Sequence, residues 1–231
     1  MTTSPEKPAA DRLIDVAGEI FALKGSSATV REICRSAKCS VAAVNYYFGD
    51  KQQLYLRCVQ TACEQKQKLF PLPKIQAQAA APALLRTFLR ALSSRIAGNA
   101  NMSWQNTLML REMISPSDGA SEILQERTRQ DFDVLDQLLG KLLGPELDSR
   151  ELRQSLETQI LARSMFLRTG KNLRHMFGLD VPSNEDPQAY SDALCDSILM
   201  QVDCLRRTCK LAPLTWTPHH NSTASQTPIE G

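Results

Sequence analysis

Apolar residues recur at helical spacing from the start of the chain. Leu13, Val16 and Ile20 lie three or four positions apart, which is the repeat of one face of an α-helix. The pattern predicts a first helix over residues 9–24. We expect this helix to end at Gly25, because glycine commonly follows the last residue of a helix.

Two very short helices follow, and a longer one comes after them. The short ones are predicted over residues 30–36 and 41–46, and the longer one begins after Asp50. Each start is preceded by a side chain of the kind that caps helix N-termini, namely Thr29, Ser40 and Asp50. Two short helices joined by a turn, between two longer helices, are typical of a helix-turn-helix domain. We therefore assign residues 9–65 to such a domain.

The rest of the chain predicts a bundle of longer helices. Pro71 and Pro73 mark a boundary, since proline does not continue a helix. Five further periodic segments cover residues 82–97, 104–114, 121–143, 149–176 and 187–210. The expected fold is all-α: an N-terminal three-helix helix-turn-helix domain and a C-terminal helical bundle over residues 76–211, with about nine helices in all. The aperiodic tails, residues 1–8 and 212–231, are expected to be disordered.

The composition is that of an ordinary soluble helical protein. Of 231 residues, 42% are hydrophobic and only 6% aromatic, and clear hairpin signals are absent. The N-terminal residues contain no apolar signal region, and no stretch approaches the roughly 18 apolar residues that span a membrane. We therefore expect a cytoplasmic protein with no membrane partner.

The charge distribution is more informative than the net charge of +2. Residues 24–68 hold eight Lys and Arg against three acidic residues, a local excess of five positive charges. A polyanion such as DNA would be attracted to this segment, although a solvated helix surface is the plain alternative.

The sequence contains no pattern that indicates catalysis. We find no His-Glu-x-x-His, no Gly-x-Ser-x-Gly and no phosphate-binding glycine loop, and the chain has only three histidines. We expect no enzyme activity, no catalytic residue, no metal site and no cofactor.

One segment carries a specific motif. Residues 29–58 read TVREICRSAKCSVAAVNYYFGDKQQLYLRC. This segment resembles the DNA-binding domain of the TetR family of bacterial transcriptional regulators, and the resemblance covers about residues 11–63. The matching positions are Thr29, Ile33, Tyr46, Tyr47, Phe48, Gly49, Lys51 and Leu54. The AAVNYYFG form and the later segment from Trp104 to Met113, which ends in LREM, resemble a subgroup of that family.

The resemblance and the spacing together predict two faces for the recognition helix. Val44 and Phe48 are four residues apart and are expected to face the core with Ile33 and Leu54. The opposite face then enters the major groove, where alanines contact thymine methyl groups and Asn45 pairs with adenine. Tyrosine, threonine and lysine side chains at this site suit phosphates. The predicted DNA-binding residues are Thr29, Arg31, Ser40, Val41, Ala42, Ala43, Asn45, Tyr46, Tyr47 and Lys51.

The recognition helix departs from the family in one respect. Members often have Lys-Gly or Arg-Gly after the capping serine, where this chain has Val41 and Ala42. The change removes a polar base contact, so sequence specificity is expected to depend on Asn45, on apolar contacts and on DNA shape.

The resemblance implies that the C-terminal half dimerises and binds a small molecule. Apolar stripes on the last two long helices are candidates for the dimer interface, unless they only fill the core of one protomer. The interface residues predicted are Leu156, Ile160, Tyr190, Leu194, Ile198, Val202 and Leu205. The effector-binding residues predicted are Trp104, Leu108, Arg111, Met113, Phe166 and His175, some of which are equally typical of ordinary core or surface positions.

The expected function is that of a repressor that binds double-stranded DNA as a homodimer. Its operator is expected to be an inverted repeat, and an unknown small-molecule effector would release it. A redox-responsive regulator is the alternative, because the chain has seven cysteines and Cys34 and Cys39 flank the predicted turn. Buried packing explains these two thiols better.

Overall fold

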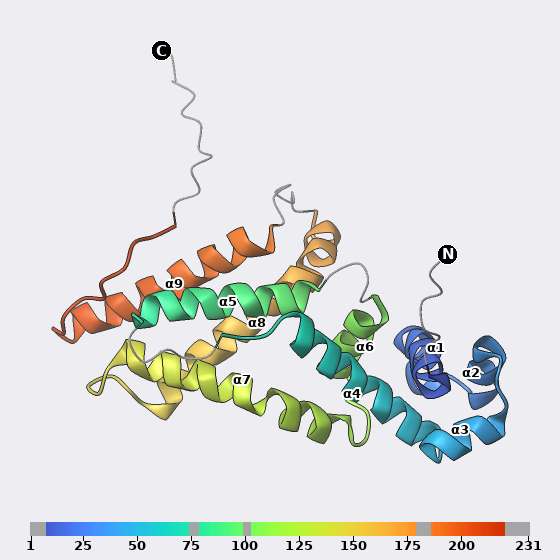
Figure 1. The fold of residues 1–231 in the computed structure, drawn as a ribbon. Helices are drawn as coiled ribbons and strands as arrows, with labels where there is room; N and C mark the ends of the chain where they lie inside the picture. Colours follow the sequence, from blue (N-terminus) through green and yellow to red (C-terminus); the bar gives the residue numbers. More distant parts are fainter. Residues whose placement is uncertain (1–7, 74–78, 99–102, 179–185, 220–231) are drawn as a thin grey trace, which may run out of the picture. The chain divides into compact units, whose positions relative to one another are not determined.

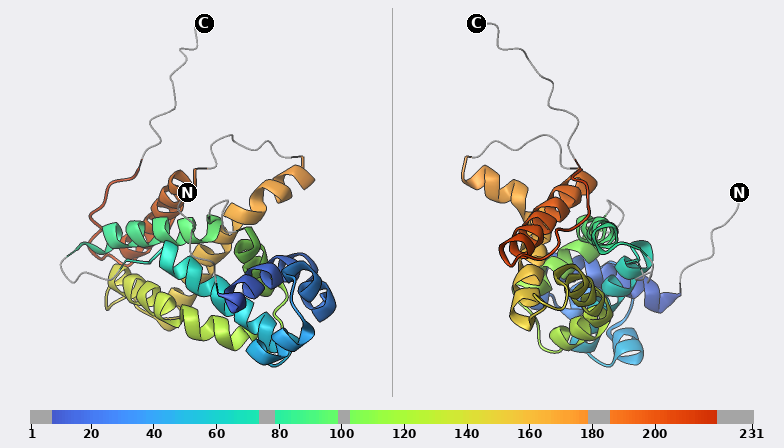
Figure 2. Two further views of the ribbon diagram at one scale, coloured as in Figure 1. Left: turned by 45° about the vertical axis from the view of Figure 1, so that its right-hand side comes forward. Right: turned by 90° about the vertical axis from the view of Figure 1, so that its left-hand side faces the viewer.

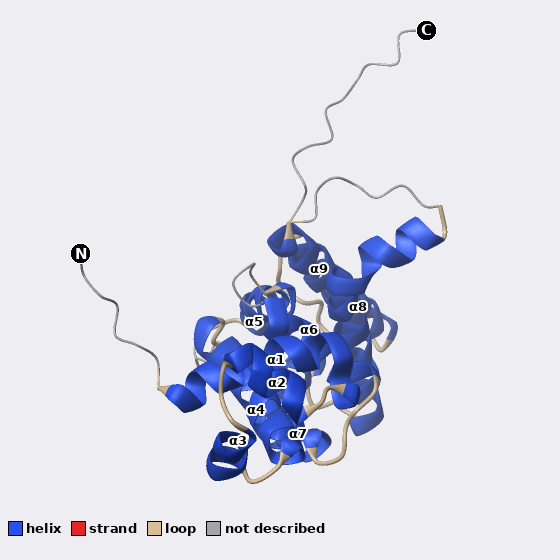
Figure 3. Ribbon diagram, turned by 90° about the vertical axis from the view of Figure 1, so that its right-hand side faces the viewer, coloured by secondary structure: helices blue, strands red, loops and turns tan. Residues whose placement is uncertain are grey.

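The computed structural model describes residues 8–73, 79–98, 103–178 and 186–219, and of residues 168–174 it describes the backbone alone. All regular structure in these residues is helical (Figure 3). In chain order (Figure 1) the elements are α1 (Ala9–Lys24), the 3₁₀ turn η1 (Gly25–Ser27), α2 (Val30–Ala37), α3 (Val41–Phe48), α4 (Lys51–Leu69), α5 (Ala81–Ala97), α6 (Ser103–Ile114), α7 (Ala120–Leu143), α8 (Arg150–Met176) and α9 (Pro187–Thr208). The all-α prediction is confirmed, and the helices of the described ranges begin and end within two residues of the predicted positions. None of these helices is long and apolar enough to cross a membrane.

The chain divides into two compact units. Residues 1–71 and 98–130 form the first unit, and residues 72–97 and 131–231 form the second. Helix α6 and the beginning of α7 therefore pack with the N-terminal helices, whereas the sequence pattern assigned them to the C-terminal domain. The physical reason is the apolar face of α6, which is buried in the core of the first unit.

Trp104 of α6 fixes how closely that helix approaches α1. Its ring lies over Gly18, and a Cβ atom on Gly18 would be only 2.5 Å from a ring carbon of Trp104. Glycine at this position therefore allows an approach that any larger residue would prevent.

The core of the first unit also holds the recognition helix. Val44, Ile33 and Leu54 are all 0% exposed, and Phe48 packs against the same core. The predicted inward face of α3 is thus confirmed.

The core of the second unit is formed by α5, α7, α8 and α9. Helices α5 and α9 lie side by side in Figures 1 and 2, and leucines dominate the space around them. Five residues predicted for the dimer interface are buried in this core of a single protomer: Leu156, Ile160, Leu194, Ile198 and Val202. Tyr190 and Leu205 are partly buried, and the Tyr190 hydroxyl donates to the carbonyl oxygen of Arg163. The interface prediction is therefore wrong for these five residues, because the stripes they form face their own protomer.

The segment after α9, residues 211–219, turns back and runs along α9 (Figures 1 and 2). We call it the C-terminal strap. The backbone N–H of Leu214 donates to Asp203 at 2.8 Å and that of His219 donates to Asp196 at 2.8 Å. Leu214 and Trp216 pack against the core. The predicted disorder of the tail is therefore wrong for residues 212–219, and residues 220–231 lie outside the described part of the chain.

A buried ion-pair cluster joins α5 to α9. Arg90 binds both carboxylate oxygens of Asp192 at 2.7 Å, and Arg86 donates to Asp192 and to Asp196. The side chains of Arg86, Asp192 and Asp196 are 14%, 13% and 11% exposed. Charges at this depth are tolerated because each one has a partner of opposite sign.

Asp192→Asn is expected to lower the free energy of unfolding by roughly 3 kcal/mol at neutral pH, since two arginines lose a shared carboxylate. Burial alone raises the pKa of Asp192, but the hydrogen bonds from Arg90 and Arg86 outweigh burial, so the pKa is lowered. The stabilisation is thus fully present above the ordinary Asp pKa of about 3.9 and is lost progressively as the pH falls from there through the lowered pKa of the folded protein. Urea unfolding at neutral pH and at about pH 2 measures both effects.

The matched control is Asp133→Asn, because Asp133 is exposed on α7. We expect that variant to unfold like the wild type. Equal destabilisation by Asp192→Asn at both pH values would show that the carboxylate charge does not stabilise this cluster.

Candidate nucleic-acid interface

The start of α2 is held by a reciprocal pair of hydrogen bonds. The Thr29 hydroxyl oxygen accepts from the backbone N–H of Glu32 at 3.2 Å, and the Glu32 carboxylate accepts from the backbone N–H of Thr29 at 3.1 Å. Lys24 also donates to Glu32. Hydrogen bonds from Lys24 and then from Thr29 lower the pKa of Glu32 to about 2. This capping box therefore stays intact at any pH near neutrality.

The turn between α2 and α3 has a left-handed residue at its centre. Lys38 has a φ of +51°, and the N–H of Cys39 donates to the carbonyl oxygen of Cys34 at 3.0 Å. Ser40 then caps α3 by accepting from the N–H of Ala43 at 3.2 Å. These bonds turn the chain within three residues, so that α3 packs against α2.

The outward face of α3 matches the prediction. Tyr46 is 83% exposed, Tyr47 46% and Val41 45%. Ala42 and Asn45 are exposed as well, whereas Ala43 is half-buried. This face carries no charge, since Val41–Phe48 contains no acidic or basic residue. It presents one amide, two phenol groups and small apolar side chains.

Three of the predicted DNA-binding residues have local structural roles. The ammonium of Lys51 donates to the carbonyl oxygens of Ser26 at 2.8 Å and Ala28 at 3.2 Å. These carbonyls belong to the end of η1 and the chain after it, where helix geometry leaves them without a partner. Thr29 and Ser40 act as helix caps. The phosphate role assigned to Lys51 thus competes with two hydrogen bonds inside the protein.

Two basic side chains of α2 are free to take that role. Arg31 and Arg35 are four residues apart, so they share one face of the helix. Lys38 follows in the turn, and all three side chains are exposed. None of these three side chains has a hydrogen bond or ion pair among the described residues. The sequence already places Arg35 four residues after Arg31 on a short predicted helix, which indicates a common face for these two side chains.

The residues predicted to bind an effector are divided between the two compact units. Trp104 and Leu108 are buried in the first core, and the guanidinium of Arg111 donates to the carbonyl oxygens of Ala22 and Leu23 at the end of α1. Met113 is 52% exposed. Phe166 and His175 belong to the other unit, where Phe166 is half-buried and His175 exposed. Within the first unit the apolar face of α6 packs against α1. The effector site stays a prediction.

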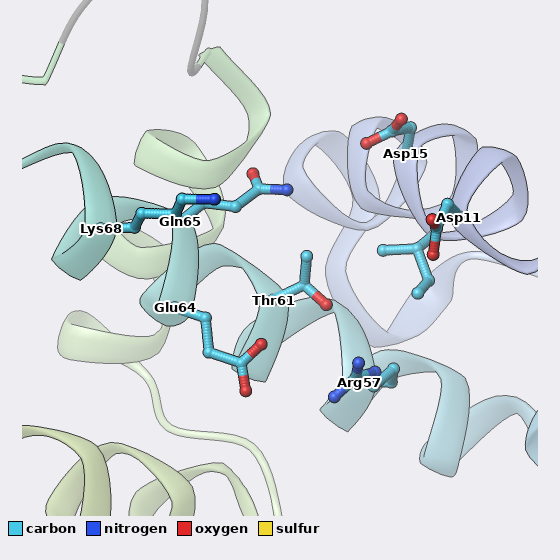
Figure 4. A pocket seen from close by; sticks show the side chains of 8 residues that line it. Asp11, Asp15, Arg57, Thr61, Glu64, Gln65 and Lys68 are labelled. Atoms are coloured by element: carbon cyan, nitrogen blue, oxygen red, sulfur yellow. The ribbon is translucent and has the colours of Figure 1, made fainter. Parts of the chain in front are cut away.

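A hollow in the first unit lies instead between α1 and α4 (Figure 4). Its volume is about 320 Å³. Asp11 and Asp15 of α1 face Thr61 and Arg57 of α4 across it, and Lys68 lies at its other end. The charges are mixed, so this hollow attracts neither sign strongly. None of the six residues predicted to bind an effector lines it.

Sequence reasoning also missed a buried carboxylate at the end of α6. Glu112 is 1% exposed, and it accepts hydrogen bonds from the Tyr55 hydroxyl and from the N–H (2.8 Å) and hydroxyl (2.9 Å) of Ser117. Burial and the bond to Glu112 raise the pKa of Tyr55 to about 12. This network ties α4 to the turn that follows α6. An acidic residue within an apolar helical pattern was the available signal.

The thiols of Cys34 and Cys39 lie close enough across the turn to affect each other's ionisation. Burial raises the pKa of Cys34, and the neighbouring Cys39 raises it further. A raised pKa keeps the thiol protonated, and the thiolate is the form that reacts with oxidants. The redox alternative is therefore not supported.

Two stretches of the chain match known families. Residues 13–58 match "Bacterial regulatory proteins, tetR family", and residues 81–176 match "HTH-type transcriptional dual regulator CecR, C-terminal domain". A relative, the HTH-type transcriptional dual regulator CecR of Shigella flexneri, is 27% identical over 184 residues, which cover 74% of this chain and 80% of the relative. The first match contains α2, α3 and the exposed face described above.

Solved structures of regulators share the fold. A putative transcriptional regulator from Pseudomonas aeruginosa PAO1 superposes with a TM-score of 0.61 at 15% identity, covering 87% of this chain and 92% of the other. The regulator FadR from Bacillus subtilis, solved in complex with stearoyl-CoA, gives a TM-score of 0.55 at 17% identity, covering 81% and 96%. At these identities the similarity extends to the fold only.

Arg35→Ala is expected to weaken DNA binding equally for all sequences, because an interaction with phosphate carries no base information. The slope of log K against log salt concentration should become shallower by about one unit for each phosphate that the variant no longer neutralises. Fluorescence anisotropy with a DNA duplex at four salt concentrations measures both quantities.

Lys51→Met is the comparison variant. Its expected effect is a lower melting temperature with an unchanged salt slope, since Lys51 binds carbonyl oxygens of its own chain. If Lys51→Met flattened the slope as much as Arg35→Ala, the ammonium would contact phosphate after all.

Proposed function

We propose that this chain, a DNA-binding transcriptional regulator with a TetR-family helix-turn-helix domain, is a repressor that binds its operator as a homodimer and is released by a small molecule. One observation carries the proposal: the exposed face of α3, which we call the reading face, is uncharged, and the opposite face of the helix is buried in the core. The exposed cations of α2 supply the attraction to phosphate that this face lacks.

Within the major groove, each exposed group of α3 has a defined chemical partner. The Asn45 amide both donates and accepts, as adenine requires, and the small side chains at 41–43 suit thymine methyl groups. Tyr46 and Tyr47 reach outward with hydroxyl groups that donate to phosphate. We therefore propose Thr29, Arg31, residues 40–43 and residues 45–47 as the contact region, with Arg35 and Lys38 added and Lys51 supporting the turn.

We further assign the chain to the subgroup that contains CecR. The motif AAVNYYFG in α3 and the LREM segment of α6 support this assignment, as does the match of residues 81–176 to the CecR C-terminal domain. The Shigella relative is described as a dual regulator. Repression is the simplest outcome for a protein that covers its operator. Activation would require a further interaction surface besides the one that binds DNA.

A homodimer is proposed through the outward faces of the last two long helices. Ala193, Met200 and Cys204 follow each other at helical spacing on α9, and all three are exposed. They are small or apolar, as the helix contacts of a four-helix bundle require. This stripe is displaced around α9 from the one that the sequence analysis selected. A twofold dimer then presents two α3 helices to an inverted repeat.

The second unit supports the proposal of an effector. DNA binding needs only the helix-turn-helix domain, yet residues beyond it form a second hydrophobic core of their own. The FadR regulator of Bacillus subtilis was solved with stearoyl-CoA, an amphiphilic metabolite. We infer that this chain also binds a small-molecule effector, and that effector binding releases the protein from its operator.

The test of the proposal begins with the full-length protein and sheared genomic DNA. Fragments that the protein retains should share one inverted repeat, and footprinting should protect two half-sites about one helical turn apart or a multiple of it. Retention of fragments without a common sequence would contradict a sequence-specific regulator.

Met200→Glu is expected to turn the dimer into monomers and to abolish operator binding, because a carboxylate would be buried at the twofold contact. Sedimentation velocity measures the mass, and circular dichroism checks that the fold is kept.

Thr87→Glu on the exposed side of α5 is the control and should remain dimeric. Leu194→Glu should instead unfold the second unit, since Leu194 is 2% exposed in one protomer. A dimer of unchanged mass for Met200→Glu would contradict the proposed interface.

A further inference from the structure

The C-terminal strap forms one wall of an open cavity in the second unit that no part of the proposed function uses. Its volume is about 170 Å³, and it lies where the strap passes the first turn of α5. The residues that matter to its chemistry are Pro82, Ala83, Arg86, Leu199, Trp216 and Thr217. The strap lies beyond residues 81–176, the stretch that matches the CecR C-terminal domain.

The cavity exists because the strap is pinned on both sides of Trp216. The backbone N–H of Leu214 donates to Asp203, and the backbone N–H of His219, five residues further along the strap, donates to Asp196. Between these bonds Trp216 is drawn across α5, where Ala83 offers only a methyl group. A large ring opposite a small side chain leaves a space that neither fills.

The walls are apolar apart from one strong donor. Trp216, Leu199 and Pro82 provide hydrocarbon and aromatic surface. Arg86 has five N–H donors, of which three go to Asp192 and Asp196. Its Nε–H and one Nη2–H have no acceptor among the described residues. Because Arg86 lines the cavity, its guanidinium has two N–H groups left with which to bind a ligand there.

The charge of Arg86 is already balanced. Arg86 and Arg90 face Asp192 and Asp196, so the cluster of two cations and two anions carries no net charge. An anionic ligand would add an unbalanced charge beside two buried carboxylates, which costs free energy. A neutral acceptor such as a carbonyl oxygen takes the free N–H groups without that cost.

We propose that this cavity binds a small uncharged aromatic compound with a carbonyl group, its ring against Trp216 and its oxygen on Arg86. The size agrees, since a cavity of about 150 Å³ is sufficient for benzene. Binding is a property of the second unit and does not depend on the proposed repression or on an operator.

The two tryptophans of the chain, Trp104 and Trp216, allow a test on the full-length protein. Labelled with 5-fluorotryptophan, the protein gives two fluorine resonances, and Trp216→Phe identifies which is which. Benzamide is the probe. We expect it to shift the Trp216 resonance to saturation and to leave the Trp104 resonance in place, with benzoate at least about tenfold weaker because of its charge.

Ala83→Leu fills the cavity and should abolish the benzamide shift. Thr87→Leu, one turn further along α5 and outside the cavity, is the matched control and should bind like the wild type. A Trp216 resonance that stays still, moves linearly without saturation, or responds equally in Ala83→Leu would overturn the proposal. Benzoate binding as tightly as benzamide would overturn the ligand class.

Discussion

Burial of Val44 is the constraint on which the DNA-binding account depends. Because Val44 is 0% exposed between α2 and α4, rotation of α3 about its own axis is excluded, and one set of side chains must face outward. The caps at Thr29, Ser40 and Asp50 fix where each helix begins, so the same face is presented every time the chain folds. The reading face is thus a consequence of packing on its opposite side.

Helix α6 completes the unit that carries this face. Trp104 over Gly18 and Glu112 beside Tyr55 join α6 to α1 and α4 by one apolar and one polar contact. Helix α6 thus belongs to the same compact unit as α3, since it is part of the core that supports α3.

The helices were predictable from sequence, but their partners were not. Periodicity and capping residues determine a helix locally. The last residue of α1 was therefore predictable from Gly25, and the first residue of α3 from Ser40. An apolar stripe on a helix indicates only that the stripe is covered, and it does not identify what covers it. Leu194 and Ile198 are buried within their own protomer, although burial against a second copy would have been equally consistent with the pattern. The strap has no periodicity, because single hydrogen bonds to α9 and one tryptophan hold it in place. Likewise the sequence shows that Lys51 is charged, while only the fold shows which oxygens it meets.

Base-pair discrimination by Asn45 tests the central claim most directly. Once an operator is known, wild type and Asn45→Ala should be compared on that site and on every single base-pair substitution within one half-site. The account predicts that Asn45→Ala removes discrimination at one A·T pair, a reduction of about 1–3 kcal/mol, and leaves the other positions unchanged. An Asn45→Ala variant that discriminates at every position as the wild type does would contradict the claim that the exposed face of α3 reads the sequence.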